Sequence, residues 1–142
     1  KGIRSFRGVE HRIEFVRLVN DIEYYNDSKA TTAESTKVAL NAFDKPVIVL
    51  VGGYDKKTGF DILKEDLQKV KNVIAFGATK EQFKALYPAT ILCLDMKEAF
   101  DKANECAQKG DIILLSPACA SYDQFNNFEQ RGKMFKEFVN QL

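Results

Sequence analysis

The chain has 142 residues, of which 45% are hydrophobic and 29% charged, a composition that suits one globular domain with a sizeable core. Its formal net charge of +1 offers no basic field for nucleic acid or an acidic membrane, and no apolar run approaches the roughly 20 residues of a transmembrane helix. The three cysteines are widely spaced and odd in number, which argues against a disulfide framework and favours a reducing cytoplasm. With one histidine and scattered carboxylates, we expect no metal site formed within this chain.

The start of the chain reads as a linker followed by a hairpin. Residues 1–10 have a linker-like composition and do not begin with Met, so we expect an interdomain linker remnant followed by one domain over residues 11–142. Two β-rich runs, Glu14–Val19 and Ile22–Tyr25, are separated only by Asn20-Asp21, which predicts an antiparallel hairpin.

Helical and strand-like patterns alternate through the rest of the chain. Apolar residues recur at helical spacing from Ala33 to Phe43, and Thr31 with Glu34 has the pattern of a capping box. Thr79 with Gln82 and Asp95 with Glu98 have the same spacing, which predicts helix caps at Thr79 and Asp95. Four continuous apolar runs predict buried strands: Val47–Val51, Val73–Phe76, Thr90–Leu94 and Ile112–Leu115. Between and after them, helical faces run over residues 60–70, 79–87, 95–107 and 128–142.

This alternation predicts an α/β fold. We expect a Rossmann-like, doubly wound, mostly parallel sheet of about six strands, with the N-terminal hairpin adding an antiparallel edge. In such sheets ligands bind outside the carboxyl ends of the strands. The loops expected there carry lysines, hydroxyls and carboxylates that suit a small anion: Asn26–Thr31, Gly52–Gly59, Gly77–Thr79 and Ser116–Gln124.

Each of these features also has a plain structural interpretation. Thr31 and Ser121 suit simple helix caps, and Gly52-Gly53 suits a simple turn. The GxxxxGK[ST] pattern of a P-loop is absent, and the absence of a GxGxxG fingerprint argues against a dinucleotide site. Cys119 has no nearby base in the sequence that would make it a nucleophile, and it suits a small buried residue.

Four stretches together resemble a known family. They are the pair His11-Arg12, YYNDSKATTAEST (24–36), VGGYDKKTGF (51–60) and LLSPACASYDQFNNFEQRG (114–132). In order and spacing they are similar to the C-terminal domain of the Mur ligases, in the branch that adds D-glutamate to UDP-MurNAc-L-alanine. The resemblance covers nearly the whole chain, and the last motif is the most specific.

The resemblance implies an ATP-dependent, amide-forming ligase of peptidoglycan synthesis in the cytoplasm. Such enzymes have three domains. ATP and magnesium are bound mainly by the central one, UDP-MurNAc-L-alanine by the first, and the third brings in D-glutamate and closes over the nucleotide. Only the third matches this chain, so its partners would be the N-terminal and central domains of the same protein, and the domain alone is expected to be inactive.

For the amino-acid site, the resemblance implies five residues. Lys56 would hold a carboxylate of D-glutamate, and Thr31 would hydrogen-bond the same molecule. Ser121, through its side chain, and Phe128, through its backbone amide, would bind its carboxylates. Lys29 lies in the DSKAT motif near the same pocket, and Lys29 and Lys56 would act in the reaction.

For the nucleotide, the resemblance implies three further residues. His11 and Arg12 match a pair at the interdomain junction, with Arg12 directed toward the phosphates, and Asp27 matches a residue that contacts the ribose or adjoining groups. Two points stay open in the sequence. Lys57 competes with Lys56 for the lysine role. The alternative functions are another Mur- or folylpolyglutamate-type amide ligase domain, or a non-catalytic anion-binding α/β module.

Overall fold

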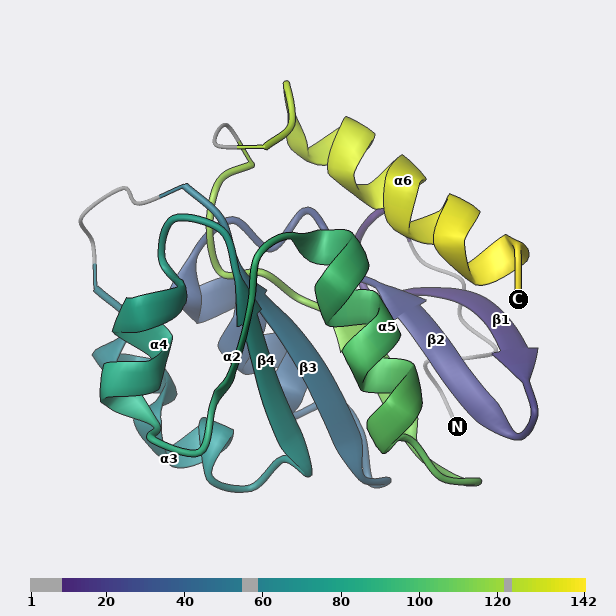
Figure 1. The fold of residues 1–142 in the computed structure, drawn as a ribbon, viewed down its shortest axis with the longest axis horizontal. Coiled ribbons are helices and arrows are strands. Elements are labelled where there is room, and N and C mark those ends of the chain that lie inside the picture. Colours follow the sequence, from purple (N-terminus) through teal and green to yellow (C-terminus); the bar gives the residue numbers. More distant parts are fainter. Residues whose placement is uncertain (1–8, 55–58, 122–123) are drawn as a thin grey trace.

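A six-stranded, mostly parallel sheet forms the centre of the computed structural model, which describes residues 9–54, 59–121 and 124–142 (Figure 1). The strands lie in the order β1-β2-β6-β3-β4-β5, and within this sheet only the β1–β2 pair is antiparallel. The expected fold is therefore confirmed. The bounds are β1 Glu14–Val19, β2 Ile22–Asn26, β3 Val47–Gly52, β4 Asn72–Phe76, β5 Ile91–Cys93 and β6 Ile112–Leu115.

The N-terminal hairpin forms as predicted. Asn20 and Asp21 both have positive φ, at 52° and 67°, which is the geometry of a two-residue turn whose twist matches the flanking strands. Asn and Asp tolerate this conformation better than other residues with a side chain. The hairpin joins the rest of the sheet through β2, which pairs in parallel with β6.

Helices cover both faces of the sheet. They are α2 (Ala33–Leu40), α3 (Lys64–Leu67), α4 (Lys80–Leu86), α5 (Met96–Cys106) and α6 (Phe128–Asn140), with a short 3-10 helix, η1 (Asp61–Leu63), before α3. In Figure 1, α5 and α6 lie in front of the sheet and α2 behind it. Within the part of the chain that the structure describes, none of these helices is long and apolar enough to span a bilayer.

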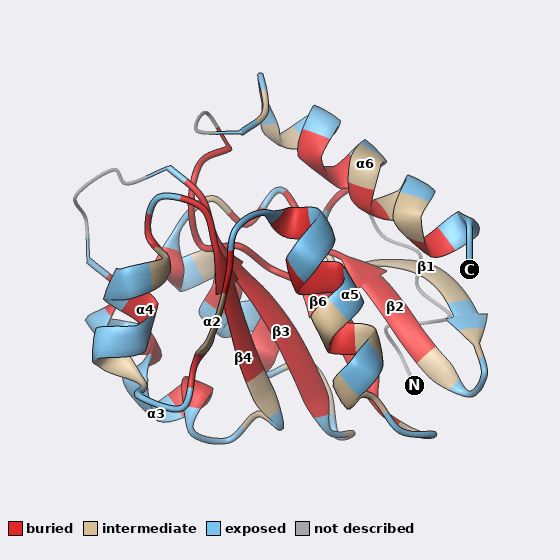
Figure 2. Cartoon of the chain, in the orientation of Figure 1, coloured by how far each residue is buried: buried red, intermediate tan, exposed pale blue. Residues whose placement is uncertain are grey.

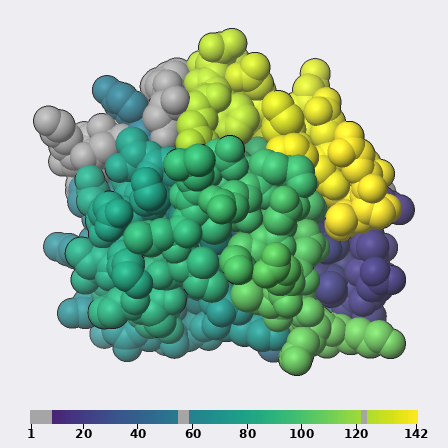
Figure 3. Space-filling model, in the orientation of Figure 1, coloured from purple at the N-terminus to yellow at the C-terminus, as the bar shows by residue number. Residues whose placement is uncertain are grey.

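Two apolar clusters hold these layers together, one on each face. The first joins the sheet to α2, η1, α3 and α4, and the second joins it to α5 and α6. Strands β3, β6 and most of β4 are buried, as Figure 2 shows, because parallel strands are covered on both sides. Figure 3 shows the surface of the α5 and α6 side, where the two helices pack next to each other.

Three local predictions were wrong. Helix α2 is capped by Thr32, which accepts a hydrogen bond from the Ser35 amide, and not by Thr31. Thr79 precedes α4 but makes no capping bond, because its hydroxyl accepts from the Gly53 amide instead. The expected helix over residues 60–70 is a 3-10 turn followed by a single α-helical turn. The Asp95 cap is confirmed by a bond from the Glu98 amide.

Candidate functional site

The described parts of the four predicted loops meet at the carboxyl edge of the sheet. This edge lies uppermost in Figure 1. The loops are joined directly by hydrogen bonds from the Ser116 hydroxyl to Asp27 (2.7 Å), from the Ala118 amide to the Ala30 carbonyl (2.9 Å) and from the Gly53 amide to Thr79 (3.1 Å). Parallel strands bring these segments together although they lie up to 89 residues apart in the sequence.

The turn after β3 requires its two glycines. Gly52 has φ +126°, and a Cβ there would lie 1.9 Å from the Phe76 carbonyl oxygen. Gly53 has φ +143°, and its Cβ would lie 2.5 Å from the Ala120 carbonyl oxygen. The backbone therefore leaves β3 along a path that only glycine fits. Lys56, the predicted carboxylate ligand, lies with its competitor Lys57 in residues 55–58, outside the described residues.

Asp27 is a buried carboxylate at the centre of this edge, with only 3% of its surface exposed. One oxygen accepts from the Ile13 amide (3.0 Å) and the other from the Ser116 hydroxyl (2.7 Å). Burial raises the pKa of Asp27 from its ordinary 3.8 to about 6, although both hydrogen bonds and the charges of Arg12 and Arg131 act in the opposite direction. The carboxylate thus fixes the segment before β1 to the loop after β6.

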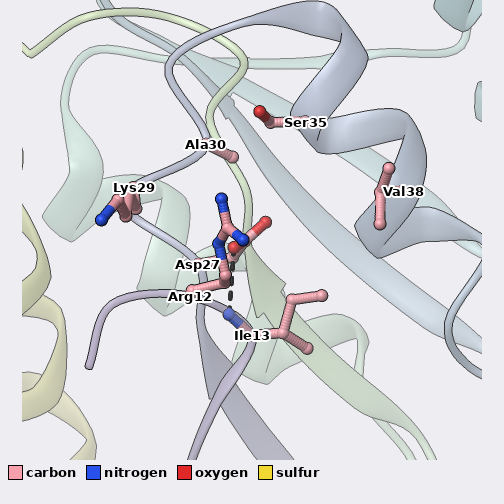
Figure 4. Close-up of a pocket in the computed structure, with 7 residues that line it drawn as sticks. All are labelled: Arg12, Ile13, Asp27, Lys29, Ala30, Ser35 and Val38. Carbon is pink, nitrogen blue, oxygen red and sulfur yellow. Dashed lines mark hydrogen bonds between the residues drawn. The ribbon is translucent and has the colours of Figure 1, made fainter. Parts of the chain in front are cut away.

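A hollow of about 130 Å³ opens beside Asp27 (Figure 4). Two cations, Arg12 and Lys29, contribute to its wall, and both are exposed. Thr31 is half-buried on the same loop as Lys29. The chemistry of this wall suits an anionic group that enters from solvent. The full lining consists of Arg12, Ile13, Asp27, Lys29, Ala30, Ser35 and Val38.

His11 does not line this hollow. Its ring is buried against α6, where a Cβ on Gly132 would lie 2.2 Å from the Nδ1 atom. The same Nδ1 lies 2.9 Å from Nδ2, the side-chain nitrogen of Asn26. His11 and Ile13 both have positive φ, at 69° and 45°, which is a strained conformation for residues with a side chain. The buried ring and the Ile13–Asp27 bond hold the residue between them, Arg12, at the edge of the hollow.

The other two predicted amino-acid ligands lie on the last loop and helix. Ser121 is buried, at 3% exposure, and its carbonyl accepts from the Phe125 amide. Phe128 is the first residue of α6, where backbone amides lack helical partners and the helix dipole favours negative charge. Its ring centroid lies 5.9 Å from Lys29 Nζ. The start of α6 and the loop with Lys29 and Thr31 therefore face each other.

Two further residues lie at this edge: Ser28, which belongs to the predicted loop Asn26–Thr31, and Arg131, which sequence reasoning missed. Both are fully buried. Arg131 Nε donates to the Ser28 hydroxyl (2.9 Å), and Nη2 donates to the Ser28 carbonyl (2.7 Å). The sequence did hold a signal, because Arg131 lies three residues after Phe128 and four before Phe135, which places it on the inward stripe of the predicted helix.

One group of possible metal ligands occurs among the described residues. Glu10, His11 and Glu14 bring their ligand atoms within 4.8 Å of one another. The ammonium of Lys136 lies 2.8 Å from Glu10 and 3.2 Å from Glu14, so one protein cation is shared by the two carboxylates.

Comparison with known proteins shows which family this chain is similar to. Residues 11–119 match the family model described as Mur ligase, glutamate ligase domain. A UDP-N-acetylmuramoylalanine--D-glutamate ligase of Caldicellulosiruptor bescii is 50% identical over 146 residues, which cover 99% of this chain and 32% of the relative. The protein of the same name from Caldicellulosiruptor saccharolyticus is 47% identical over 148 residues, covering 100% and 33%. This chain thus spans about a third of the length of the curated relatives it matches.

A solved structure shows the same fold at low sequence identity. A bifunctional folylpolyglutamate synthase/dihydrofolate synthase of Yersinia pestis, solved with AMPPNP and a manganese ion, superposes with a TM-score of 0.67 at 13% identity. The match covers 93% of this chain and 32% of that protein. At this identity the likeness concerns the fold alone.

Proposed function

Because this chain belongs to the Mur ligase family, we propose that it serves as the amino-acid-binding domain of a ligase that adds D-glutamate to UDP-MurNAc-L-alanine. The observation that carries the proposal is the pairing of a lysine-bearing loop with the amide-rich start of a helix at one edge. The loop with Lys29 and Thr31 faces the first turn of α6 at Phe128. A dicarboxylate needs two such cationic or amide-rich contacts at once.

The work of this domain would be to position the amine of D-glutamate. Elsewhere in the full-length protein, ATP would phosphorylate the carboxylate of UDP-MurNAc-L-alanine and leave as ADP. The amine would then attack the carbonyl carbon of the acyl phosphate, forming the amide bond as the bond to phosphate breaks, and inorganic phosphate and a proton would be released. Holding the carboxylates of the amino acid while its amine approaches is a proximity effect. Lys29 and Lys56 would add electrostatic stabilisation of the developing phosphate charge. This division of work also predicts that the chain alone does not form amide bonds.

The nucleotide would contact this domain only in part. The hollow beside Asp27, at about 130 Å³, is smaller than the several hundred Å³ of pockets that enclose a whole small molecule, so it fits a phosphate or a ribose edge. Arg12 and Asp27 both line this hollow, and Arg12 would meet phosphates there. His11 would act indirectly, because its buried ring anchors the neighbouring Arg12. Magnesium would be held mainly by the central domain.

The alternative of a folylpolyglutamate-type ligase rests on the fold alone, at 13% identity. By contrast, the relatives at 47–50% identity carry the D-glutamate ligase name. An anion-binding module without catalytic partners can be distinguished by experiment. It would bind D- and L-glutamate with equal affinity, and it would also bind inorganic phosphate.

The test is a titration of the chain with D-glutamate followed by amide chemical shifts in NMR, with L-glutamate as the matched control. We expect shifts at Thr31, Ser121 and Phe128, and in the segment with Lys56, for the D enantiomer only. A repeat in the full-length protein with ATP and UDP-MurNAc-L-alanine covers a site that is completed by domain closure. No D-specific shift in either form would contradict the proposal.

A further inference from the structure

Two buried residues at the carboxyl edge, Ser28 and Arg131, join the two elements to which the proposed function assigns the amino acid. We infer that they form a clamp that fixes the start of α6 against the loop of residues 27–31 and so sets the geometry of the carboxylate site. The inference deepens the proposed function and rests on it. Both are positioning residues, since the ligand contacts are made by their neighbours.

The contacts of Ser28 run in two directions. Its hydroxyl donates to the carbonyl of Phe128 (2.7 Å), the first residue of α6, and accepts from Arg131 Nε (2.9 Å). Its own amide donates to the Asn26 side chain (3.1 Å), which orients the loop as it leaves β2. Ser28 directly precedes Lys29, so a shift of Ser28 moves Lys29, whereas Asp27 on its other side is held independently by the Ile13 amide and the Ser116 hydroxyl.

Arg131 completes the clamp from the helix side. Its Nε and Nη2 atoms donate to the hydroxyl and the carbonyl of Ser28. These two parallel bonds need the planar guanidinium, and a lysine could not make both. A Cβ on Gly53 would lie 3.3 Å from its Nη1 atom, so the same side chain also reaches the turn after β3. Three segments far apart in the sequence thus pack around one buried cation.

This arrangement points to positioning beyond simple stability. The bonds from Arg131 to Ser28 cross 103 residues and end on the two elements that face each other at the proposed site. Catalytic and binding groups need to be held within about 0.5 Å of the productive geometry. Loss of the clamp lets the Lys29–Thr31 loop and the α6 amides move apart, which weakens binding of a ligand that bridges them.

The test uses steady-state kinetics of the full-length ligase with the variants Ser28→Ala, Arg131→Met and Arg131→Lys. We expect the KM for D-glutamate to rise by about tenfold or more for Ser28→Ala and Arg131→Met, since hydrogen bonds to a charged group are lost. The KM for ATP should change by less than about threefold, because Asp27 beside the nucleotide hollow keeps its hydrogen bonds to Ile13 and Ser116 in these variants. Arg131→Lys, which keeps the charge and loses the fork, should fall between wild type and Arg131→Met.

A second measurement separates positioning from folding. Hydrogen exchange of the 142-residue chain should become faster at the amides of residues 28–31 in Ser28→Ala and Arg131→Met, while the amides of β3 and β6 keep their protection. The double variant should resemble the single variants, because the two residues act as one unit. Lys133→Met, which removes an exposed charge from the same helix, is the matched control and should match wild type.

The outcomes separate the two proposals. If the wild-type ligase uses D-glutamate but the variants keep its KM, or raise both KM values equally, the clamp is overturned and the proposed function stands. Faster exchange over the whole domain would also overturn it, since that result means a purely structural role. If the wild-type protein does not join D-glutamate to UDP-MurNAc-L-alanine, the proposed function fails and the clamp's role in it fails too.

Discussion

The two edges of the sheet treat buried charge in opposite ways. At the amino edge, Glu23 and Asp111 are each 4% exposed and each is paired with a lysine, Lys45 at 2.6 Å and Lys71 at 2.5 Å. At the carboxyl edge, the equally buried Asp27 is held by a hydroxyl and a backbone amide. Internal ion pairs neutralise charge and close an edge, whereas neutral partners leave nearby cations available to a ligand.

The exposed cations of the carboxyl edge support this reading. Arg12 and Lys29 both face solvent beside the hollow, whereas the side chains of Lys45 and Lys71 are 35% and 28% exposed and are bound to carboxylates. The amino edge thus contributes to stability, and the carboxyl edge carries the candidate site. Substitutions at individual positions of the two edges test this difference.

The largest effect is expected from glycine replacement at the two edges. Gly52→Ala places a Cβ 1.9 Å from the Phe76 carbonyl at φ +126°, so we expect the free energy of unfolding to fall by about 4 kcal/mol. Gly110→Ala at the amino edge is the matched control. It has φ +92° but open space around its Cβ, so only about 1–2 kcal/mol should be lost. Urea unfolding of both variants measures the difference, and equal losses would contradict the steric argument.

The raised pKa of Asp27 predicts a pH dependence of stability. Because the folded state holds this proton more tightly than the unfolded state, the stabilising contribution is complete below pH 3.8 and is lost as pH rises through about 6. The shift of about two units corresponds to a loss on the order of 3 kcal/mol between pH 4 and 7. Asp27→Asn should remove this slope in urea unfolding curves. The exposed Asp101→Asn controls for net charge, and an unchanged slope in Asp27→Asn would refute the assignment.

A smaller loss is expected where an ion pair is opened at the amino edge. Lys71→Met leaves Asp111 buried without its cation, but since the lysine side chain is 28% exposed, we expect a loss of about 2 kcal/mol, less than for a fully buried pair. Lys97→Met is the control, because both members of its pair with Asp101 are more than half exposed and about 0.5 kcal/mol or less should be lost. Binding of D-glutamate should stay unchanged in both variants, and a weakened affinity in Lys71→Met would break the comparison between the edges.

The smallest effect separates two neighbouring threonines. Thr32→Ala removes the cap of α2 and should lower the free energy of unfolding by about 1 kcal/mol without changing D-glutamate binding. Thr31→Ala should do the reverse, with stability within about 0.5 kcal/mol of wild type and a weaker D-glutamate affinity. Thermal unfolding and the NMR titration together decide between them. Loss of stability in Thr31→Ala alone would reverse the roles.

The succession of strands and helices along the chain could be predicted because apolar runs such as Val47–Val51 are short, rich in β-branched residues and bounded by Pro46 and Gly52, which favours a buried strand over a helix. The position of the candidate site at the carboxyl ends of the strands could be predicted from the α/β topology. The helix cap could not be resolved, because Thr31 and Thr32 both suit the position and only the extended backbone of Thr32 and the Ser35 amide decide it. Thr79 was misjudged for a different reason, since its hydroxyl is taken by the Gly53 amide, 26 residues away.

The buried polar residues were the hardest to predict. Arginine is almost never fully buried unless it is paired, so Arg131 was overlooked although it lies on the inward stripe of α6. The resemblance placed His11 at the interdomain junction near the nucleotide, but the packing of its ring against Gly132 could not be predicted from the sequence. In both cases the position depends on a partner from the other end of the chain, which local patterns do not contain.

The strand order has a consequence for how the domain is made. Strand β6 is the last in the sequence, yet it lies between β2 and β3, pairing Glu23 with Ile112 and Val47 with Ile112. Until it is inserted, the hairpin and the other three strands form two separate half-sheets. Such long-range closure is slow in folding, because the loop entropy is lost before the contacts form. During synthesis from the N-terminus, the loop of residues 27–31 and the turn at Gly52 therefore come together only after residue 115 has emerged.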